Sequence, residues 1–220
     1  MDRIPVYFMP GLAASSQIFE NIKLPEETFK MILLEWEVPL DGETLEEYAK
    51  RISKMITHEN PDLLGVSFGG ILVQEMSKFV KARKVIILSS IKSNTEFPLR
   101  MKIAKSTKAY KLIPLDLVMK VEMLTKFSFG PKINERLKLY EKFLSIRDKK
   151  YLTWAIEQVM LWQRDKPDEN VIHIHGDADE IFPAKNITNY IPVKGGTHIM
   201  IINRFKWLNE NLPKIIMGET

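Results

Sequence analysis

Short apolar runs alternate with stretches of helical periodicity over much of this chain. Each run has the length of a buried β-strand, and the uninterrupted run at 85–88 is typical of a parallel strand that is covered on both faces. The predicted strands lie at 6–9, 30–34, 63–66, 85–88 and 171–174, with a weaker one within 187–193. The first of these runs ends at Pro10-Gly11, a pair typical of a turn.

Helices are predicted in the intervals between these runs. Thr44 followed by Glu47 is a capping-box pattern, which predicts a helix that begins there and continues to about residue 58. A second helix is expected after Ser67. Its apolar face would be formed by Ile71, Leu72, Met76 and Phe79. Further helices are predicted at 148–162 and at 198–211.

The alternation of strands and helices stops between residues 91 and 169. This segment shows no convincing strand pattern, and it is rich in Lys, Met, Leu and Phe at helical spacing. Pro98, Pro114 and Gly130-Pro131 interrupt the periodicity and divide the segment into several helices. Its position after the fourth predicted strand suggests a helical cap that folds over the edge of a sheet.

The whole pattern predicts an α/β fold, with an open, mostly parallel sheet of about six strands and helices on both faces. Residues 1–90 and 170–220 are expected to form the core, and residues 91–169 the inserted helical cap. In such sheets ligands bind at the carboxyl ends of the strands. The residues that follow each predicted strand are therefore the ones to search for chemistry.

Composition narrows the class of protein. The chain has 220 residues, of which 45% are hydrophobic, and it contains no cysteine, so disulfides, thiolate zinc sites and cysteine nucleophiles are excluded. No apolar run approaches the length of a membrane span, and the apolar run near the N-terminus is too short for a signal peptide. A cytoplasmic protein without a transmembrane segment is expected.

The positive charge of the chain is concentrated in one region. Residues 92–168 contain 17 Lys and Arg but only 9 Asp and Glu, whereas the formal net charge of the whole chain is +4. A solvated helical surface explains this excess, and an anionic substrate or an acidic membrane surface is the alternative. No nucleic-acid-binding motif accompanies the excess, so no nucleic-acid partner is predicted.

The pentapeptide at 65–69, Gly-Val-Ser-Phe-Gly, lies where an apolar strand gives way to a helix. This context places Ser67 on a sharp strand-to-helix turn with its hydroxyl exposed above the sheet. Side chains two residues away on either side would collide in such a turn, and glycine at positions 65 and 69 removes those collisions. Ser67 is therefore the candidate nucleophile.

A serine nucleophile needs a base, usually histidine, which is oriented by a carboxylate. Of the 4 histidines, His198 is the best candidate base, because it lies in a loop that follows the last predicted strand. His173 lies within a strand, where a hydrogen-bonded core residue is expected. The acidic loop after the fifth strand supplies the carboxylate. We assign Asp179 to it, with Asp177 shaping the turn and Glu180 facing solvent.

These three segments together resemble the α/β-hydrolase superfamily. The family has the chain order Ser, Asp or Glu, His, matched here by Ser67, Asp179 and His198. The sequence His-Gly-Asp-Ala-Asp-Glu-Ile-Phe-Pro at 175–183 is similar to the family's acid loop, and Gly-Gly-Thr-His at 195–198 is similar to its histidine loop. The likeness covers residues 5–90 and 170–212. It suggests no subfamily for the cap.

The turn at Pro10-Gly11-Leu12 resembles the family's oxyanion loop, although the family commonly has His-Gly where this chain has Pro-Gly. The resemblance implies that the backbone N–H of Leu12 is one oxyanion donor. The N–H of Phe68, at the start of the helix after Ser67, is the other. The family's first two strands have no counterpart here, which implies a compact member with about six strands.

The resemblance implies a serine hydrolase that cleaves a carboxylic ester or thioester of a small molecule through an acyl-enzyme. No metal and no organic cofactor are implied, and the oligomeric state stays open. Two alternatives also stay open. One is a non-catalytic binding or receptor protein on the same scaffold. The other is a different reaction of the same three residues, such as acyl transfer, C–C bond hydrolysis or perhydrolysis.

Large apolar side chains of the cap are candidates for lining an acyl-binding pocket, and methionines among them would make it adaptable. A helix core is the stronger explanation for such stripes. The residues concerned are Met101, Met119, Met123, Phe127, Phe129, Trp154, Met160 and Trp162.

Overall fold

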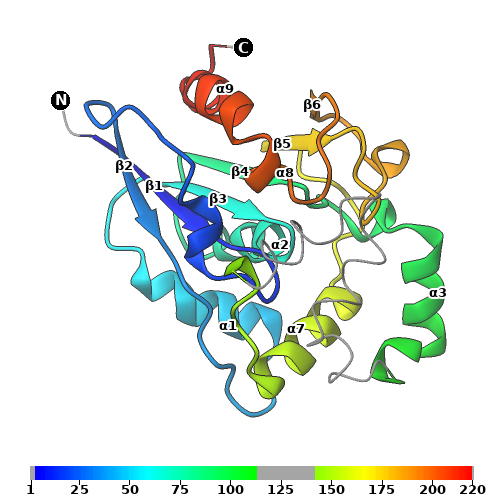
Figure 1. Cartoon of the computed structure of the whole chain (residues 1–220). Coiled ribbons are helices and arrows are strands. Elements are labelled where there is room, and N and C mark those ends of the chain that lie inside the picture. The colour runs from blue at the N-terminus through cyan, green and yellow to red at the C-terminus, as the bar shows by residue number, and fades with distance from the viewer. Residues whose placement is uncertain (1–2, 113–141, 220) are drawn as a thin grey trace.

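The computed structural model describes residues 3–112 and 142–219 (Figure 1). Its centre is a six-stranded, entirely parallel sheet with the strand order β2-β1-β3-β4-β5-β6. The strands are β1 (Ile4–Met9), β2 (Phe29–Leu33), β3 (Asp62–Val66), β4 (Lys84–Leu88), β5 (Val171–Gly176) and β6 (Ile191–Val193). The predicted fold class is confirmed.

Helices cover both faces of the sheet. The α-helices are α1 (Leu45–Ile52), α2 (Phe68–Met76), α3 (Leu99–Thr107), α7 (Lys149–Leu161), α8 (Met200–Asn203) and α9 (Phe205–Met217). Short 3-10 helices are η1 (Ser16–Phe19), η2 (Ser53–Met55), η3 (Asn94–Glu96), η4 (Ala109–Leu112) and η5 (Ala184–Asn186). Figure 1 shows α9 on one side of the sheet and α1 with α7 on the other.

The apolar strands divide their side chains between two cores. On β1, Tyr7 and Met9 pack into the cluster that includes α1, α2 and α7, whereas Val6 and Phe8 pack into the cluster that includes α9. Successive side chains of a strand point to opposite faces, so a strand buried on both faces must be apolar at every position. This requirement explains the uninterrupted apolar runs in the sequence.

The C-terminal helical segment differs from the prediction of one helix at 198–211. It forms α8 and then α9, which continues to Met217 although Pro213 lies inside it. Proline removes one backbone hydrogen bond from a helix. The buried face of α9 spans this position, with Leu208 and Leu212 before Pro213 and Ile215 after it. Packing against the sheet on both sides of Pro213 therefore stabilises the helix beyond the proline.

Smaller differences concern the ends of predicted elements. The capping box of Thr44 and Glu47 is present, but α1 ends at Ile52 and is followed by η2. Helix α2 ends at Met76, so Phe79 lies beyond it and is exposed. The weak sixth strand, predicted within 187–193, shortens to β6, because residues 187–190 are irregular and Asn189 has φ 47°, which is incompatible with a strand.

In the predicted cap segment the described residues form η3, α3, η4 and α7, and none of them belongs to a strand. Helix α7 is fastened to the core by two hydrogen bonds: Trp154 Nε1 donates to the Glu43 carbonyl at 2.6 Å, and the Leu45 N–H donates to Gln158 Oε1 at 3.0 Å. No helix within 3–112 and 142–219 has the length and apolarity needed to cross a membrane.

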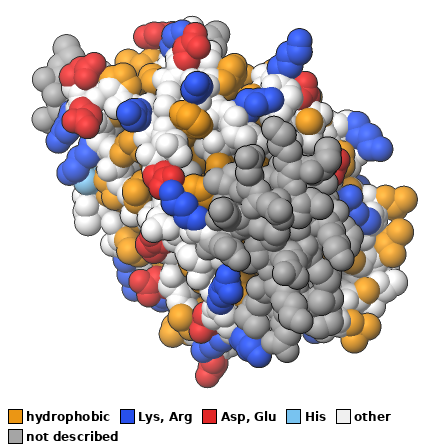
Figure 2. Space-filling model, in the orientation of Figure 1, with side chains coloured by type: hydrophobic (Ala, Val, Ile, Leu, Met, Phe, Trp, Pro, Cys, Tyr) orange, Lys and Arg blue, Asp and Glu red, His pale blue; other side chains and the backbone are white. Residues whose placement is uncertain are grey.

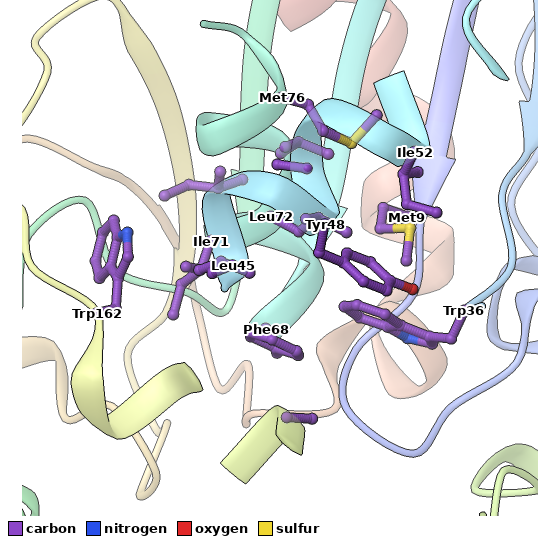
Figure 3. Close-up of a cluster of buried hydrophobic side chains, with 14 of the residues drawn as sticks. Met9, Trp36, Leu45, Tyr48, Ile52, Phe68, Ile71, Leu72, Met76 and Trp162 are labelled. Carbon is purple, nitrogen blue, oxygen red and sulfur yellow. The ribbon is translucent and has the colours of Figure 1, made fainter. Parts of the chain in front are cut away.

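We expect the core around α2 to dominate stability (Figure 3). Leu72 is completely buried there, and Leu72→Ala should lower the free energy of unfolding by about 2–5 kcal/mol, because it removes contacts and leaves a cavity. Urea denaturation measures this change. Leu40→Ala is the control, since Leu40 is 60% exposed and should change stability by less than about 0.5 kcal/mol. Equal losses would contradict the assignment of this core.

Candidate active site

Ser67 lies between the end of β3 and the start of α2, in a backbone conformation with φ 52° and ψ −119°. Such a conformation is costly for a residue with a side chain. A Cβ atom on Gly65 would lie 2.2 Å from the Gly69 carbonyl oxygen, and one on Gly69 would lie 2.3 Å from the Pro10 carbonyl oxygen. The predicted need for glycine at both positions is confirmed. The collision at Gly69 is with the loop after β1 and not with the turn itself.

The strained turn is held by its neighbour β4. The Ser67 N–H donates to the Leu88 carbonyl at 2.9 Å, and the hydroxyl of buried Ser90 donates to the Ser67 carbonyl at 2.7 Å. Sequence analysis missed Ser90. Its only signal was its place just after the fourth apolar run, where polar residues approach the carboxyl edge of the sheet.

The structure brings the three predicted side chains into contact. His198 Nε2 lies 2.9 Å from Ser67 Oγ, and His198 Nδ1 lies 2.9 Å from Asp179 Oδ2. The imidazole side chain is 19% exposed, whereas the carboxylate is fully buried. This arrangement allows Asp179 to accept from Nδ1–H, which leaves Nε2 free to accept the hydroxyl proton of Ser67.

The Asp179 carboxylate is oriented by its own loop. Its Oδ1 accepts hydrogen bonds from the N–H groups of Ile181 at 2.8 Å and Phe182 at 2.9 Å, while Oδ2 faces His198. Burial opposes ionisation, but the charge and hydrogen bond of His198 and the Phe182 N–H outweigh it, so the pKa of Asp179 lies below its usual 3.8. The carboxylate is therefore charged at neutral pH.

Two close contacts bring the acid loop and the histidine loop together. A Cβ atom on Gly176 would lie 2.1 Å from the Gly196 carbonyl oxygen, so the two backbones approach as closely as glycine permits. Asp177 Oδ1 accepts from the Gly195 N–H at 2.6 Å. Asp177 thus shapes the turn by binding the neighbouring loop, and Glu180 is exposed as predicted.

His173 and His175 lie buried beneath this site. His173 Nε2 is 3.1 Å from His175 Nδ1, and His175 Nε2 donates to the Phe182 carbonyl at 2.8 Å. His173 is thus a hydrogen-bonded core residue, as expected. His175 Nε2 lies 3.7 Å from Asp179 Oδ2. Among the described residues, His175 makes no hydrogen bond to Ser67. His175 thus stabilises the acid loop through its hydrogen bond to the Phe182 carbonyl.

The predicted oxyanion donors flank Ser67. The loop after β1 passes close to it, since a Cβ atom on Gly11 would lie 3.4 Å from Ser67 Cβ. Leu12 and Phe68 both line the cavity beside the serine. Phe68 is the first residue of α2, and the first N–H groups of a helix have no partner within it. Its N–H is therefore available to a developing negative charge.

A cavity of about 300 Å³ opens onto Ser67. Ser67 and His198 are the only residues with polar side chains among its described lining. The lining consists of Gly11, Leu12, Ala13, Ala14, Ile18, Val66, Ser67, Phe68, Ile71, Met101, Phe143, Leu144, Val159, Ile181, Phe182, His198, Ile199, Ile201 and Ile202. Such a wall suits an uncharged, apolar group.

The cap residues considered for this cavity have different positions. Met101 lines it, whereas Trp154, Met160 and Trp162 are buried in the helix packing away from it. Met119, Met123, Phe127 and Phe129 lie outside the described residues. Trp154 and Trp162 belong to the cluster that includes α1, α2 and α7, which confirms the helix-core explanation for these two side chains.

The excess of basic residues does not reach the described wall of the cavity, which contains no Lys or Arg. On the face in Figure 2, basic side chains are interspersed with acidic ones. This distribution favours a solvated surface. Among the described residues, no group of three His, Cys, Asp or Glu side chains is placed to hold a metal ion.

The buried histidines should make stability depend on pH. Burial lowers the pKa of His175, and burial with the nearby His175 and Lys92 lowers that of His173 well below 6.5. The unfolded chain then binds protons that the folded chain does not. The contribution of these two histidines to the free energy of unfolding is therefore complete above pH 6.5 and is lost as the pH drops below it.

We expect His173→Gln to reduce this loss between pH 6.5 and 5.0 by up to about 1.4 kcal/mol per pH unit. Urea denaturation across the pH range measures it. Between pH 8 and 7 both proteins should show nearly the same pH dependence, because His173 is mostly neutral there even in the unfolded chain. Equal slopes at low pH would contradict a neutral, buried His173.

No protein-family model and no curated protein matches this chain, but solved structures do. An esterase from Thermogutta terrifontis has a TM-score of 0.73 at 12% identity, over 98% of this chain and 90% of that one. An esterase from Exiguobacterium antarcticum has a TM-score of 0.69 at 17% identity, over 97% and 92%. A Mycobacterium tuberculosis protein, provisionally named a non-heme bromoperoxidase, has a TM-score of 0.75 at 12% identity, over 100% of this chain and 94% of that one. The chain has the α/β-hydrolase fold.

Proposed function

We propose that this protein is a serine hydrolase that cleaves a carboxylic ester or thioester through an acyl-enzyme. The observation that carries this proposal is the hydrogen-bonded row of Ser67, His198 and Asp179 at the mouth of an apolar cavity. The esterases among the structures of the same fold add to it.

In the proposed first step, Ser67 Oγ attacks the acyl carbon while His198 Nε2 takes the hydroxyl proton. Asp179 holds the imidazole through Nδ1 and stabilises its positive charge, as its low pKa allows. His198 then protonates the leaving alcohol or thiol. Water, deprotonated by the same imidazole, attacks the acyl-enzyme and releases the acid.

The N–H groups of Leu12 and Phe68 are proposed to stabilise the negative charge on the former carbonyl oxygen. Each such donor typically accelerates the reaction by about 10²–10³-fold. The donors come from two separate segments, the loop after β1 and the start of α2, and both segments flank Ser67. A pair of donors in this position favours acyl chemistry over simple binding.

The acyl group of the substrate is proposed to be uncharged and apolar. The described cavity wall contains no Lys, Arg, Asp or Glu that could pair with a charged acyl chain, whereas aliphatic side chains supply most of the contact surface. Residues 91–169 are proposed to act as the cap that closes this cavity, since Met101, Phe143, Leu144 and Val159 contribute to its wall.

The proposed nucleophile is tested with a fluorophosphonate probe, which reacts with activated serines. We expect one probe per chain, bound at Ser67, and no labelling of Ser67→Ala, since the probe needs the activated hydroxyl.

Ester turnover by Ser67→Ala should fall at least about 10³-fold. His198→Ala should lose turnover while staying folded, and His175→Ala should lose less. Equal labelling of Ser67→Ala would refute the assignment.

The proposed substrate class is tested with nitrophenyl esters from acetate to laurate. Each added methylene that enters the cavity is worth about 0.8 kcal/mol, so kcat/KM should rise up to about fourfold per methylene until the cavity is full. Val159→Phe should move the optimum to a shorter chain, because Val159 lines the cavity. Leu161→Phe, on the same helix but exposed, is the matched control. Background rates for all esters would favour a binding protein instead.

A further inference from the structure

Trp36 is buried beside the candidate active site without lining the cavity (Figure 3). It follows β2, and its Nε1–H donates to the Gly11 carbonyl oxygen at 2.9 Å. The neighbouring Glu35 carboxylate accepts from the Ser16 N–H at 3.1 Å, and the Leu34 N–H donates to the Phe8 carbonyl at 2.9 Å. Three successive residues after β2 are thus hydrogen-bonded to β1 and to the chain that follows β1.

The carbonyl that Trp36 holds belongs to the same peptide unit as the Leu12 N–H. A peptide unit is planar, and in the trans form its C=O and N–H point in opposite directions. The structure contains no cis peptide bond among its described residues. A hydrogen bond that holds the Gly11 oxygen toward Trp36 therefore aims the Leu12 N–H away from Trp36.

This peptide is one that could rotate. Gly11 precedes it, and glycine has the widest choice of backbone angles. Ala13, the residue after Leu12, has φ 63°, a conformation that non-glycine residues rarely adopt. The Gly11 carbonyl oxygen also accepts a hydrogen bond from the Ala14 N–H at 3.1 Å. The Ala13 carbonyl accepts one from the Ile146 N–H at 3.1 Å. Trp36 supplies the one side-chain bond to this carbonyl found among the described residues.

Trp36 also contacts the second proposed donor residue. Its ring stacks on the Phe68 ring with 4.9 Å between centroids and 6° between planes. The side chain thus bridges the loop that carries the Leu12 N–H and the residue that carries the other N–H. Figure 3 shows the Trp36 and Phe68 rings in the same buried group of side chains.

We propose that Trp36 is a positioning residue for the oxyanion site, acting by fixing the orientation of the peptide between Gly11 and Leu12. This inference rests on the proposed function for its kinetic consequence but not for its structural one. Trp36 does not touch the reacting atoms. Its effect reaches them through the Gly11 carbonyl and the stacked Phe68 ring.

Trp36→Phe keeps an aromatic ring against Phe68 and removes the hydrogen bond to Gly11. Trp154→Phe is the matched control: Trp154 is equally buried at 9% exposure, and its Nε1 also donates to a backbone carbonyl, that of Glu43. We expect kcat for a nitrophenyl ester to fall at least about tenfold in Trp36→Phe with KM within about twofold. In Trp154→Phe both should stay within about twofold, although urea denaturation shows a similar loss of stability.

An equal kcat for the two variants would overturn the proposal, since it would mean that Trp36 acts through general stability alone. A crystal structure of Trp36→Phe supplies a second readout that needs no turnover. A rotated or disordered peptide between Gly11 and Leu12 supports the positioning role, and an unchanged peptide overturns it. If the wild type neither hydrolyses esters nor reacts with a fluorophosphonate, the proposed function fails while the crystal structure still decides the role of Trp36.

Discussion

The hydrogen bond between His198 Nε2 and Ser67 Oγ is the interaction on which the candidate site depends. It joins residues 131 positions apart, each on a loop at the carboxyl edge of one parallel sheet. Strand β4 separates β3 from β5 in that sheet. The loops after β5 and β6 must therefore extend across the end of β4 to contact the turn at Ser67. Parallel order makes this possible, because every strand then delivers its following loop to the same edge.

Backbone groups hold the Ser67 main chain and the Asp179 carboxylate, whereas the His198 ring is bound by the side chains of these two residues. Both oxygens of Asp179 are committed, one to two N–H groups of its own loop and the other to His198. The conformation of Ser67 costs of order 1–3 kcal/mol. Bonds from β4 and the two-sided core offset this cost. The site can thus hold a serine hydroxyl at the cavity in a strained turn without help from a substrate.

The sequence predicts what local pattern encodes and misses what depends on contacts between distant segments. Apolar runs identified the strands, and loop position with chain order identified Ser67, Asp179 and His198. Trp36 and Ser90 each follow a predicted strand, but that position does not reveal their partners, because each binds a carbonyl more than twenty positions away in the chain. The continuation of α9 past Pro213 was missed for a related reason: the tertiary packing that sustains it is invisible in a propensity argument.

Two arginines of the basic region at 92–168 bind other parts of the protein. Arg100 on α3 donates to the carbonyl groups of Glu180 and Ile181, the second at 3.1 Å, so it touches the acid loop from outside the cavity. Arg164 pairs with Glu75, which is buried at the end of α2. Arg100 joins the predicted cap segment to the loop that carries Asp179, and Arg164 joins it to the helix that follows Ser67. Neither Arg100 nor Arg164 lines the cavity, so both positive charges are engaged outside its apolar wall.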